Sequence, residues 1–171
     1  MHTPSQEKSA LRPPMYIGGA AREILSLPSS SLKDGKYTLE PLKSLTKNMG
    51  VPVNILVDKN VPRGVNEAEI HRHEADLWIA IDGVVHFHVG GALVNPYVKK
   101  NADGSQNDLE LKAKEISGGQ EYTLSEGDIL YIPEGQPHVH WTDENQTARL
   151  WIIKIPARET FPLEKVSGWR A

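Results

Sequence analysis

The stretch from His71 to Val85, HRHEADLWIAIDGVV, restricts the fold of this chain more than any other part of the sequence. His71 and His73 are separated by one residue, so on a β-strand they point to the same face, because strand side chains alternate with a period of two. A hydrophobic run rich in β-branched and aromatic residues follows them. Asp82-Gly83 ends the run and is typical of a tight hairpin turn. The stretch predicts β-strands that carry a pair of imidazoles.

A second stretch, Gly127 to His140 (GDILYIPEGQPHVH), has the same character. It delivers His138 and His140 at the start of a strand, directly after a turn rich in Pro and Gly. Many other short strands are expected between Gly, Asp and Pro turns, a pattern that predicts an all-β sandwich or barrel. Between the two stretches, the turn-forming cluster 101–108 predicts an inserted hairpin or lid.

The chain divides into three parts by composition. Residues 51–156 are expected to form the barrel, and 171 residues suffice for one domain with a core. Residues 1–50 give weak, mixed signals and are expected to be an N-terminal arm that packs on the barrel or on a second subunit. Residues 157–171 are expected to be a C-terminal extension that folds back over it.

Charge and composition limit the classes of partner and of metal ligand that we expect. The chain has 19 basic and 22 acidic residues, a net charge of −3 and no long basic run, so we expect no nucleic-acid or membrane partner. No apolar stretch is long enough to span a bilayer, and no signal-peptide pattern is visible, which leaves the compartment open with the cytoplasm as default. Cysteine is absent, so any metal must be held by histidines and carboxylates.

Together the two stretches resemble the paired motifs of the cupin superfamily. The residues that match the first motif are Gly64, His71, His73, Asp76 and Gly83. Those that match the second are Gly127, Pro133, Gly135 and His138. The resemblance covers residues 53–156 and departs from the family pattern in three places. The acidic residue is Asp76 rather than Glu and follows His73 after two residues, Thr142 stands where the family often has Asn, and the segment between the motifs is long.

The resemblance implies an all-β double-stranded β-helix, also called a jelly-roll barrel, that binds one divalent transition metal. The implied ligands are His71, His73 and His138 with Asp76 as the carboxylate. Glu69 is the rival carboxylate, because it lies two residues before His71 on the same strand face. Such ligands suit Fe(II), Mn(II), Ni(II), Zn(II) or Cu(II) and do not select among them.

Two further residues are candidates for the pocket. His140 shares a strand face with His138, so it can be an additional ligand, a hydrogen-bond partner of a ligand, a general acid/base, or a histidine bonded within the barrel wall. Trp78 lies on the same face as Asp76 and can line the pocket or belong to the core. The pair His86 and His88 alternates with apolar residues and is expected to face outward.

These features favour a metal-dependent cupin enzyme acting on a small polar or carbonyl-bearing organic molecule. A dioxygenase is the first expectation, with an isomerase or lyase next, and His140 is the expected proton-transfer residue. The alternative is a non-catalytic barrel of the sensor or storage type that binds a metal or small molecule. A homodimer is expected, partly because Leu77, Ile79 and Ile81 form an apolar face that needs covering.

Overall fold

The computed structural model describes residues 25–28, 31–37 and 51–157. Most of the expected N-terminal arm and nearly all of the C-terminal extension lie outside these ranges. The strands are β1 (Gly35–Tyr37), β2 (Val53–Lys59), β3 (Ala68–His71), β4 (Glu74–Asp82), β5 (Val85–Val89), β6 (Ala92–Val94), β7 (Tyr97–Lys100), β8 (Gln106–Ala113), β9 (Glu115–Ser117), β10 (Gln120–Leu124), β11 (Ile129–Ile132), β12 (His138–Trp141) and β13 (Thr147–Pro156). No helix in the described part of the chain is long and apolar enough to cross a bilayer.

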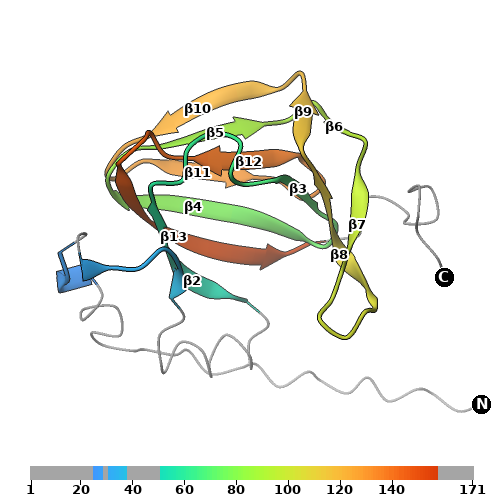
Figure 1. Cartoon of the computed structure of the whole chain (residues 1–171), viewed down its shortest axis with the longest axis horizontal. Coiled ribbons are helices and arrows are strands. Elements are labelled where there is room, and N and C mark those ends of the chain that lie inside the picture. Colours follow the sequence, from blue (N-terminus) through green and yellow to red (C-terminus); the bar gives the residue numbers. More distant parts are fainter. Residues whose placement is uncertain (1–24, 29–30, 38–50, 158–171) are drawn as a thin grey trace, which may run out of the picture.

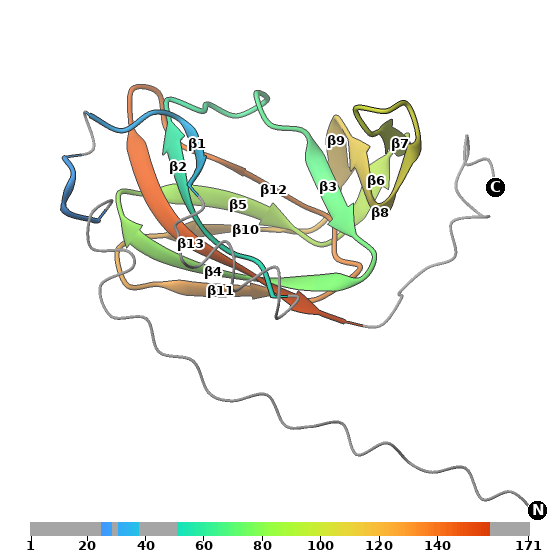
Figure 2. The same cartoon turned by 90° about the horizontal axis from the view of Figure 1, so that it is seen from below.

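Two antiparallel sheets face each other and form the barrel (Figure 1). The five-stranded sheet has the order β1-β2-β13-β4-β11, and the six-stranded sheet has the order β10-β5-β12-β3-β8-β7. Figure 2 shows β4, β11 and β13 on one side of the barrel and β5 and β12 on the other. The all-β jelly-roll prediction is confirmed.

The turn at Asp82-Gly83 differs from the expected hairpin. It joins β4 to β5, and these strands belong to different sheets, so the turn carries the chain across the barrel instead of pairing its neighbours. Gly83 has a φ of 75°, and a Cβ at this position would lie 2.3 Å from the backbone oxygen of Thr147. The close approach of β13 therefore requires glycine here. The turn at Pro133–Gly135 makes the same kind of crossing, from β11 to β12.

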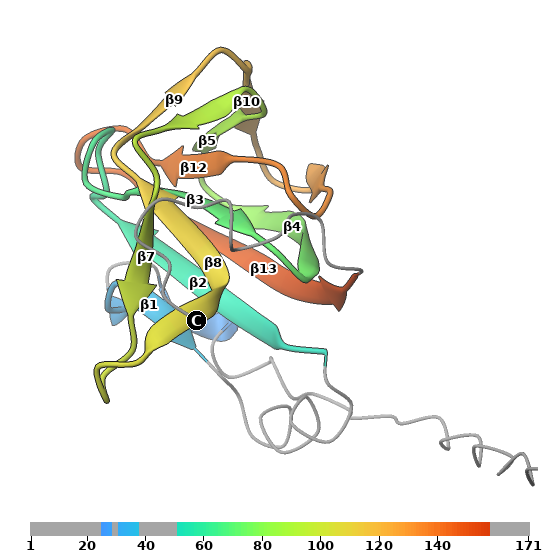
Figure 3. The same ribbon diagram turned by 90° about the vertical axis from the view of Figure 1, so that its right-hand side faces the viewer.

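The expected inserted hairpin is present as β7 and β8 (Figure 3). Its strands pair with each other on both sides of a turn in which Asn101 accepts the backbone N–H of Gly104 and donates to the backbone oxygen of Ser105. Strand β8 also pairs with β3 from Ala68↔Ala113 to His71↔Glu110. The hairpin thus widens the six-stranded sheet beside the first motif.

The core lies between the two sheets and follows strand alternation. Val85 and Phe87 are fully buried, and Phe87 packs edge-on against Trp78 with ring centroids 5.0 Å apart. His86 and His88 occupy the alternate positions of β5, and His88 bonds to the backbone oxygen of Gly118. The apolar face of β5 therefore points inward, which leaves the outer face to its two histidines.

Candidate metal centre

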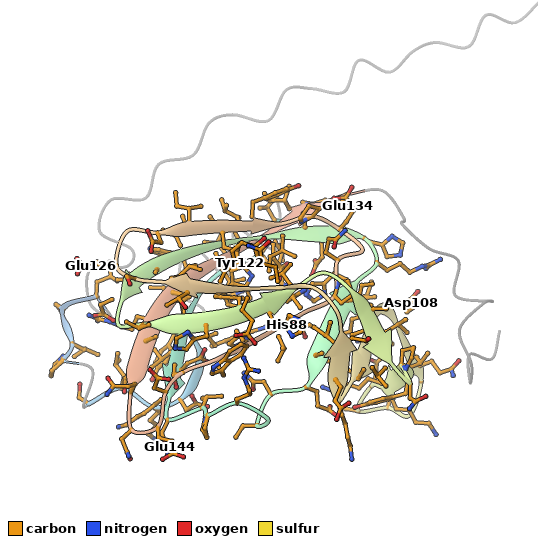
Figure 4. The ribbon with its side chains drawn as sticks, turned by 90° about the horizontal axis from the view of Figure 1, so that it is seen from above. His88, Asp108, Tyr122, Glu126, Glu134 and Glu144 are labelled. Carbon is orange, nitrogen blue, oxygen red and sulfur yellow. The ribbon has the colours of Figure 1, made fainter. Side chains whose placement is uncertain are left out.

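Four side chains from both sheets converge at one place in the barrel. They are Glu69, His71, Asp76 and His138, and each offers a ligand atom within 4.8 Å of the others. Glu69 and His138 are direct cross-strand partners on β3 and β12, whereas Asp76 comes from β4 in the opposite sheet. The backbone N–H of Gly135 donates to the oxygen of His71 at 2.9 Å, which ties the turn of the second motif to the first. Figure 4 shows Glu134, within that turn, towards the same end as Asp108 and away from Glu126 and Glu144.

The spacing of the four donor atoms suits a first-row metal ion. His71 Nε2 lies 3.3 Å from Glu69 Oε1 and 3.4 Å from Asp76 Oδ2. His138 Nε2 lies at the same two distances from the same oxygens. Ligand atoms bonded at about 2.0–2.1 Å to one tetrahedral ion lie roughly 3.3–3.4 Å apart. These four histidine–carboxylate distances are therefore those expected between ligands of one ion, and all the donor atoms lie within 4.8 Å of one another.

His138 is oriented as metal-binding histidines are. It is 1% exposed, and its Nδ1 donates to the backbone oxygen of Gln136 at 3.0 Å, which fixes the ring. Its Nε2 is buried, has no hydrogen bond within the described residues, and faces the carboxylates of Glu69 and Asp76. Burial lowers the pKa of His138, but the two carboxylates outweigh it and raise that pKa to about 9. Either a proton or a metal ion must balance the charge at this nitrogen.

The two carboxylates are anionic in this arrangement. Burial raises the pKa of Glu69 and of Asp76, but the imidazoles of His138 and His71 that face them lower both more strongly. The pKa of each acid therefore lies well below its usual range. Ionised carboxylates bind metal without first releasing a proton.

A lysine that the motifs do not include reaches the same cluster. Lys154 is the direct cross-strand partner of Asp76, and its Nζ lies 2.9 Å from Asp76 Oδ2 and 2.7 Å from Oδ1. The same Nζ donates to His71 Nε2 at 2.6 Å. The sequence pattern indicates that the side chain of Lys154 points inward, because Lys154 continues the alternation of the buried residues Leu150 and Ile152 on β13. A lysine in an apolar strand is easily assigned to the surface, so its inward direction is evident only from the register.

In the metal-free cluster, the proton that balances the two carboxylates is carried by His138 rather than by His71. Burial and the charge of Lys154 lower the pKa of His71, but the carboxylates of Asp76 and Glu69 outweigh them and raise it, so the contact with Lys154 decides which ring nitrogen carries a proton. Because the Nζ of Lys154 can only donate, the Nε2 of His71 must accept and stay unprotonated. His71 is thus neutral at the atom that faces the cluster.

His73 does not join the cluster. Strand β3 ends at His71 and β4 begins at Glu74, so Arg72 and His73 form a bend and the two-residue alternation stops before His73. Its Nε2 lies 3.2 Å from Arg72 Nη1, and its backbone oxygen accepts the N–H of Ala157. The chain crosses between sheets here, and this crossing turns the second histidine away. The structure brings together two imidazoles and two carboxylates in place of the expected three and one.

A cavity of about 420 Å³ lies beside the cluster. Its lining includes Glu69, His138 and Lys154 at the cluster, together with Lys112. Trp78 also lines it, as the sequence predicted for a pocket residue, while remaining 2% exposed. The cavity gives a small molecule access to the candidate ligands.

His140 lies in the same cavity but outside the four-residue group. Its Nε2 is 3.2 Å from the buried carboxylate oxygen Oδ2 of Asp58, and Asn66 donates to its backbone oxygen at 3.1 Å. The amide nitrogen of Asn66 also lies 3.1 Å from Nε2 and can only donate, so the Nε2 of a neutral His140 accepts from Asn66, and the Asp58 carboxylate lies beside the ring without a hydrogen bond to it. Sequence analysis missed Asp58, which no motif marks.

Comparison with known proteins places the barrel in a family. The family described as JmjC domain matches residues 51–156, which is more than half of the chain. No curated protein matches the sequence.

Solved structures with a similar fold share little sequence with this chain. A protein of Bacillus halodurans is 15% identical, with 64% of this chain and 65% of that one covered at a TM-score of 0.41. A Klebsiella pneumoniae protein with a double-stranded β-helix domain is 18% identical, with 66% and 72% covered at 0.41. The Fe(II) form of HppE is 10% identical, with 64% and 45% covered at 0.45. The chain spans 65%, 54% and 60% of the length of the first three such structures.

Proposed function

This chain belongs to the JmjC-domain family, within the cupin superfamily, and from that premise we propose that it is a metal-dependent enzyme acting on a small polar or carbonyl-bearing organic molecule. The proposed reaction is of the dioxygenase type. Isomerase or lyase chemistry at the same ion is the next candidate. The proposed ligands are His71, His138, Asp76 and Glu69, and His73 is not among them.

The orientation of His138 carries the proposal. Its Nδ1 is held by the oxygen of Gln136, so the lone pair of Nε2 is directed between Glu69 and Asp76. A neutral core histidine would gain nothing from two buried anions at its acceptor nitrogen, whereas those anions stabilise a cation there, either a proton or the metal ion that we propose displaces it.

The ligand chemistry is compatible with iron. Two imidazoles with carboxylate oxygens and no thiolate are typical of non-haem Fe(II) oxygenases, and the chemistry that such an ion supplies when bound is activation of O₂. The chain itself binds and orients the substrate. The cavity of about 420 Å³ has the size of a small-molecule site. We propose that His140, which is bonded to Asn66 and lies beside Asp58, takes or returns a substrate proton, and Trp78 packs beside it with ring centroids 5.0 Å apart.

A second candidate is a non-catalytic ligand-binding barrel. The contact of Lys154 with Asp76 and His71 favours it, because an ammonium already neutralises part of the charge of the cluster. The two candidates differ in whether a divalent ion binds through the histidines.

Elemental analysis of protein purified without an affinity tag tests the metal site. We expect about one transition-metal ion per chain in the wild type and little in a His71→Ala, His138→Ala double variant. The matched control is the pair His86→Ala, His88→Ala on the outer face of β5, which should keep its metal. Equal metal in the wild type and the His71/His138 variant would overturn the proposed site.

Oxygen uptake by the metal-loaded protein separates the reaction types. Uptake with a candidate substrate, lost in the His71/His138 variant, supports the oxygenase. Substrate conversion without O₂ consumption points to the isomerase or lyase instead. Metal and substrate binding with no conversion points to the non-catalytic barrel.

We also propose that two copies of the chain associate through the outer face of the five-stranded sheet. The cross-strand register places Ile129 beside Ile79, and Tyr131 beside Leu77. Ile129 is 64% and Tyr131 52% exposed, which leaves a broad apolar surface to be covered. Ile81, expected in this face, instead packs partly against the cluster of Leu32, Ile55 and Val57.

Light scattering coupled to size exclusion tests the dimer. Wild-type protein should elute at twice the chain mass, and an Ile129→Glu, Tyr131→Glu variant at the chain mass. A monomeric wild type at micromolar concentration would contradict this association.

A further inference from the structure

Two lysines reach the cluster, but they contact different atoms of it. Lys112 forms an ion pair with Glu69 Oε2, whereas it is Oε1 of that carboxylate that lies 3.3 Å from each histidine. Lys154 donates to Asp76 Oδ2 at 2.9 Å and to His71 Nε2 at 2.6 Å. These are the two atoms that Asp76 and His71 contribute to the group of four donors, as their mutual distance of 3.4 Å indicates.

A donor lone pair serves either a metal ion or an N–H group. The Nε2 of a neutral imidazole has one lone pair, so it cannot accept a hydrogen bond from Lys154 and bind a metal ion at the same time. A proton-bearing ammonium at 2.6 Å and a metal ion at about 2.1 Å also repel each other strongly. Occupation of His71 Nε2 by Lys154 therefore excludes a metal bond at that atom.

We propose that Lys154 is a built-in competitor of the metal ion, an internal cation that neutralises the metal-free cluster and must withdraw before the ion binds. This inference rests on the metal site proposed above. Withdrawal requires little movement, because Nζ already lies 2.7 Å from Asp76 Oδ1 and 3.4 Å from Glu74 Oε1. Lys154 keeps those two anions when it releases His71. It thereby sets the affinity of the site for metal.

Lys112 has the opposite role. It binds the Glu69 oxygen that faces away from the histidines and so holds the carboxylate in place without using a donor atom. Lys112 and Lys154 have similar side-chain exposure, 14% and 11%, and each pairs with one carboxylate of the cluster. They therefore form a matched pair for an experiment.

The test is calorimetric titration of the metal-depleted full chain with Zn²⁺. Lys154→Met should bind Zn²⁺ about tenfold to a hundredfold more tightly than the wild type, which corresponds to removal of one or two charge-assisted hydrogen bonds that the ion must break. Lys112→Met should bind no more tightly than the wild type. Unchanged or weaker binding by Lys154→Met would mean that this lysine only orients Asp76, and would overturn the inference. If both variants gained the same affinity for Zn²⁺, the effect would come from the loss of a positive charge alone, and the inference would also be overturned.

Thermal unfolding gives a second measurement. Lys154→Met should lower the Tm of the metal-free protein, because the ammonium that neutralises the cluster is lost. Saturating Zn²⁺ should then increase Tm by more in this variant than in the wild type. Lys154→Gln, which keeps a polar end, serves if the Met variant does not fold. A Zn²⁺ affinity that is the same in the His71→Ala, His138→Ala variant and the wild type would overturn the proposed function itself. Zn²⁺ binding that depends on those histidines but not on Lys154 would overturn only this inference.

Discussion

His138 and His140 are two residues apart on β12 and line the same cavity, yet their surroundings differ. His138 is fully buried between two anionic carboxylates, and its other nitrogen is held by a backbone oxygen. His140 is partly exposed and contacts one carboxylate, that of Asp58. The first has the surroundings of a metal ligand and the second those of a proton-transfer group.

The difference lies in the strands opposite each histidine. Glu69 on β3 is the direct partner of His138, and Asp76 approaches from the other sheet. His140 lies one strand repeat further along, where Phe87 is its partner and the contact comes from Asp58 on β2. Strand β12 thus places the imidazoles of His138 and His140 in two different chemical environments about 7 Å apart.

The largest expected contrast is in metal binding. His138→Ala should weaken metal affinity by about a hundredfold to two-hundredfold, since structural sites with four ligands gain roughly 3 kcal/mol per ligand. His140→Ala should change it by less than about threefold. Competition with a chromogenic chelator measures both. Similar losses in the two variants would make His140 a ligand and remove the contrast.

The next effect is on the stability of the metal-free protein as pH changes. The pKa of His138 is raised from 6.5 to about 9 by Asp76 and Glu69, despite burial. Its contribution, on the order of 3 kcal/mol, is therefore complete below pH 6.5 and lost as pH rises through about 9. Urea unfolding at pH 6 and pH 9.5 measures this loss. His138→Asn should remove the dependence in that window, and an unaltered dependence would place the proton elsewhere.

The lowered pKa values of Glu69 and Asp76 act in the opposite direction. Their contribution is present above the usual carboxyl range and is lost only as the pH falls through their lowered values. Metal-free protein should thus be most stable between the two windows, at mildly acidic pH.

A third effect concerns turnover. His140→Gln should reduce kcat by about a hundredfold, the usual contribution of a general acid or base, while metal content stays at the wild-type level. Assays with the substrate identified by oxygen uptake or conversion provide the measurement. An active, metal-loaded His140→Gln protein would show that the second histidine only forms part of the wall.

The smallest expected effect is that of Asp58. Asp58→Asn should lower kcat about tenfold, since the negative charge 3.2 Å from the Nε2 of His140 is lost while the bond of that ring to Asn66 remains. Metal affinity should not change, because Asp58 does not belong to the four-residue group. A parallel drop in metal affinity would show that the two ends of the cavity are coupled.

Much of the barrel could be predicted from local patterns. Alternating strands and Gly or Pro turns depend on neighbouring residues alone, so many short strands between such turns were expected, and the described residues contain them. The approach of His71, Asp76 and His138 to one another also agrees with the motif spacing. Glu69 was identified as the rival of Asp76, and the structure places both in the cluster.

The composition of the cluster could not be predicted in the same way. His73 leaves it because the chain bends from one sheet to the other directly after His71, and alternation holds only within a continuous strand. Lys154 and Asp58 enter the cavity through pairing with strands far away in the chain, as Lys154 does opposite Asp76.

That this chain forms a β-barrel with histidines and carboxylates directed to its interior follows from local properties, period-two patterning and turn chemistry. Which of those groups meet depends on the folded barrel. The end of a strand and the register between strands fix where each side chain lies, and both depend on contacts between residues that are distant in the chain.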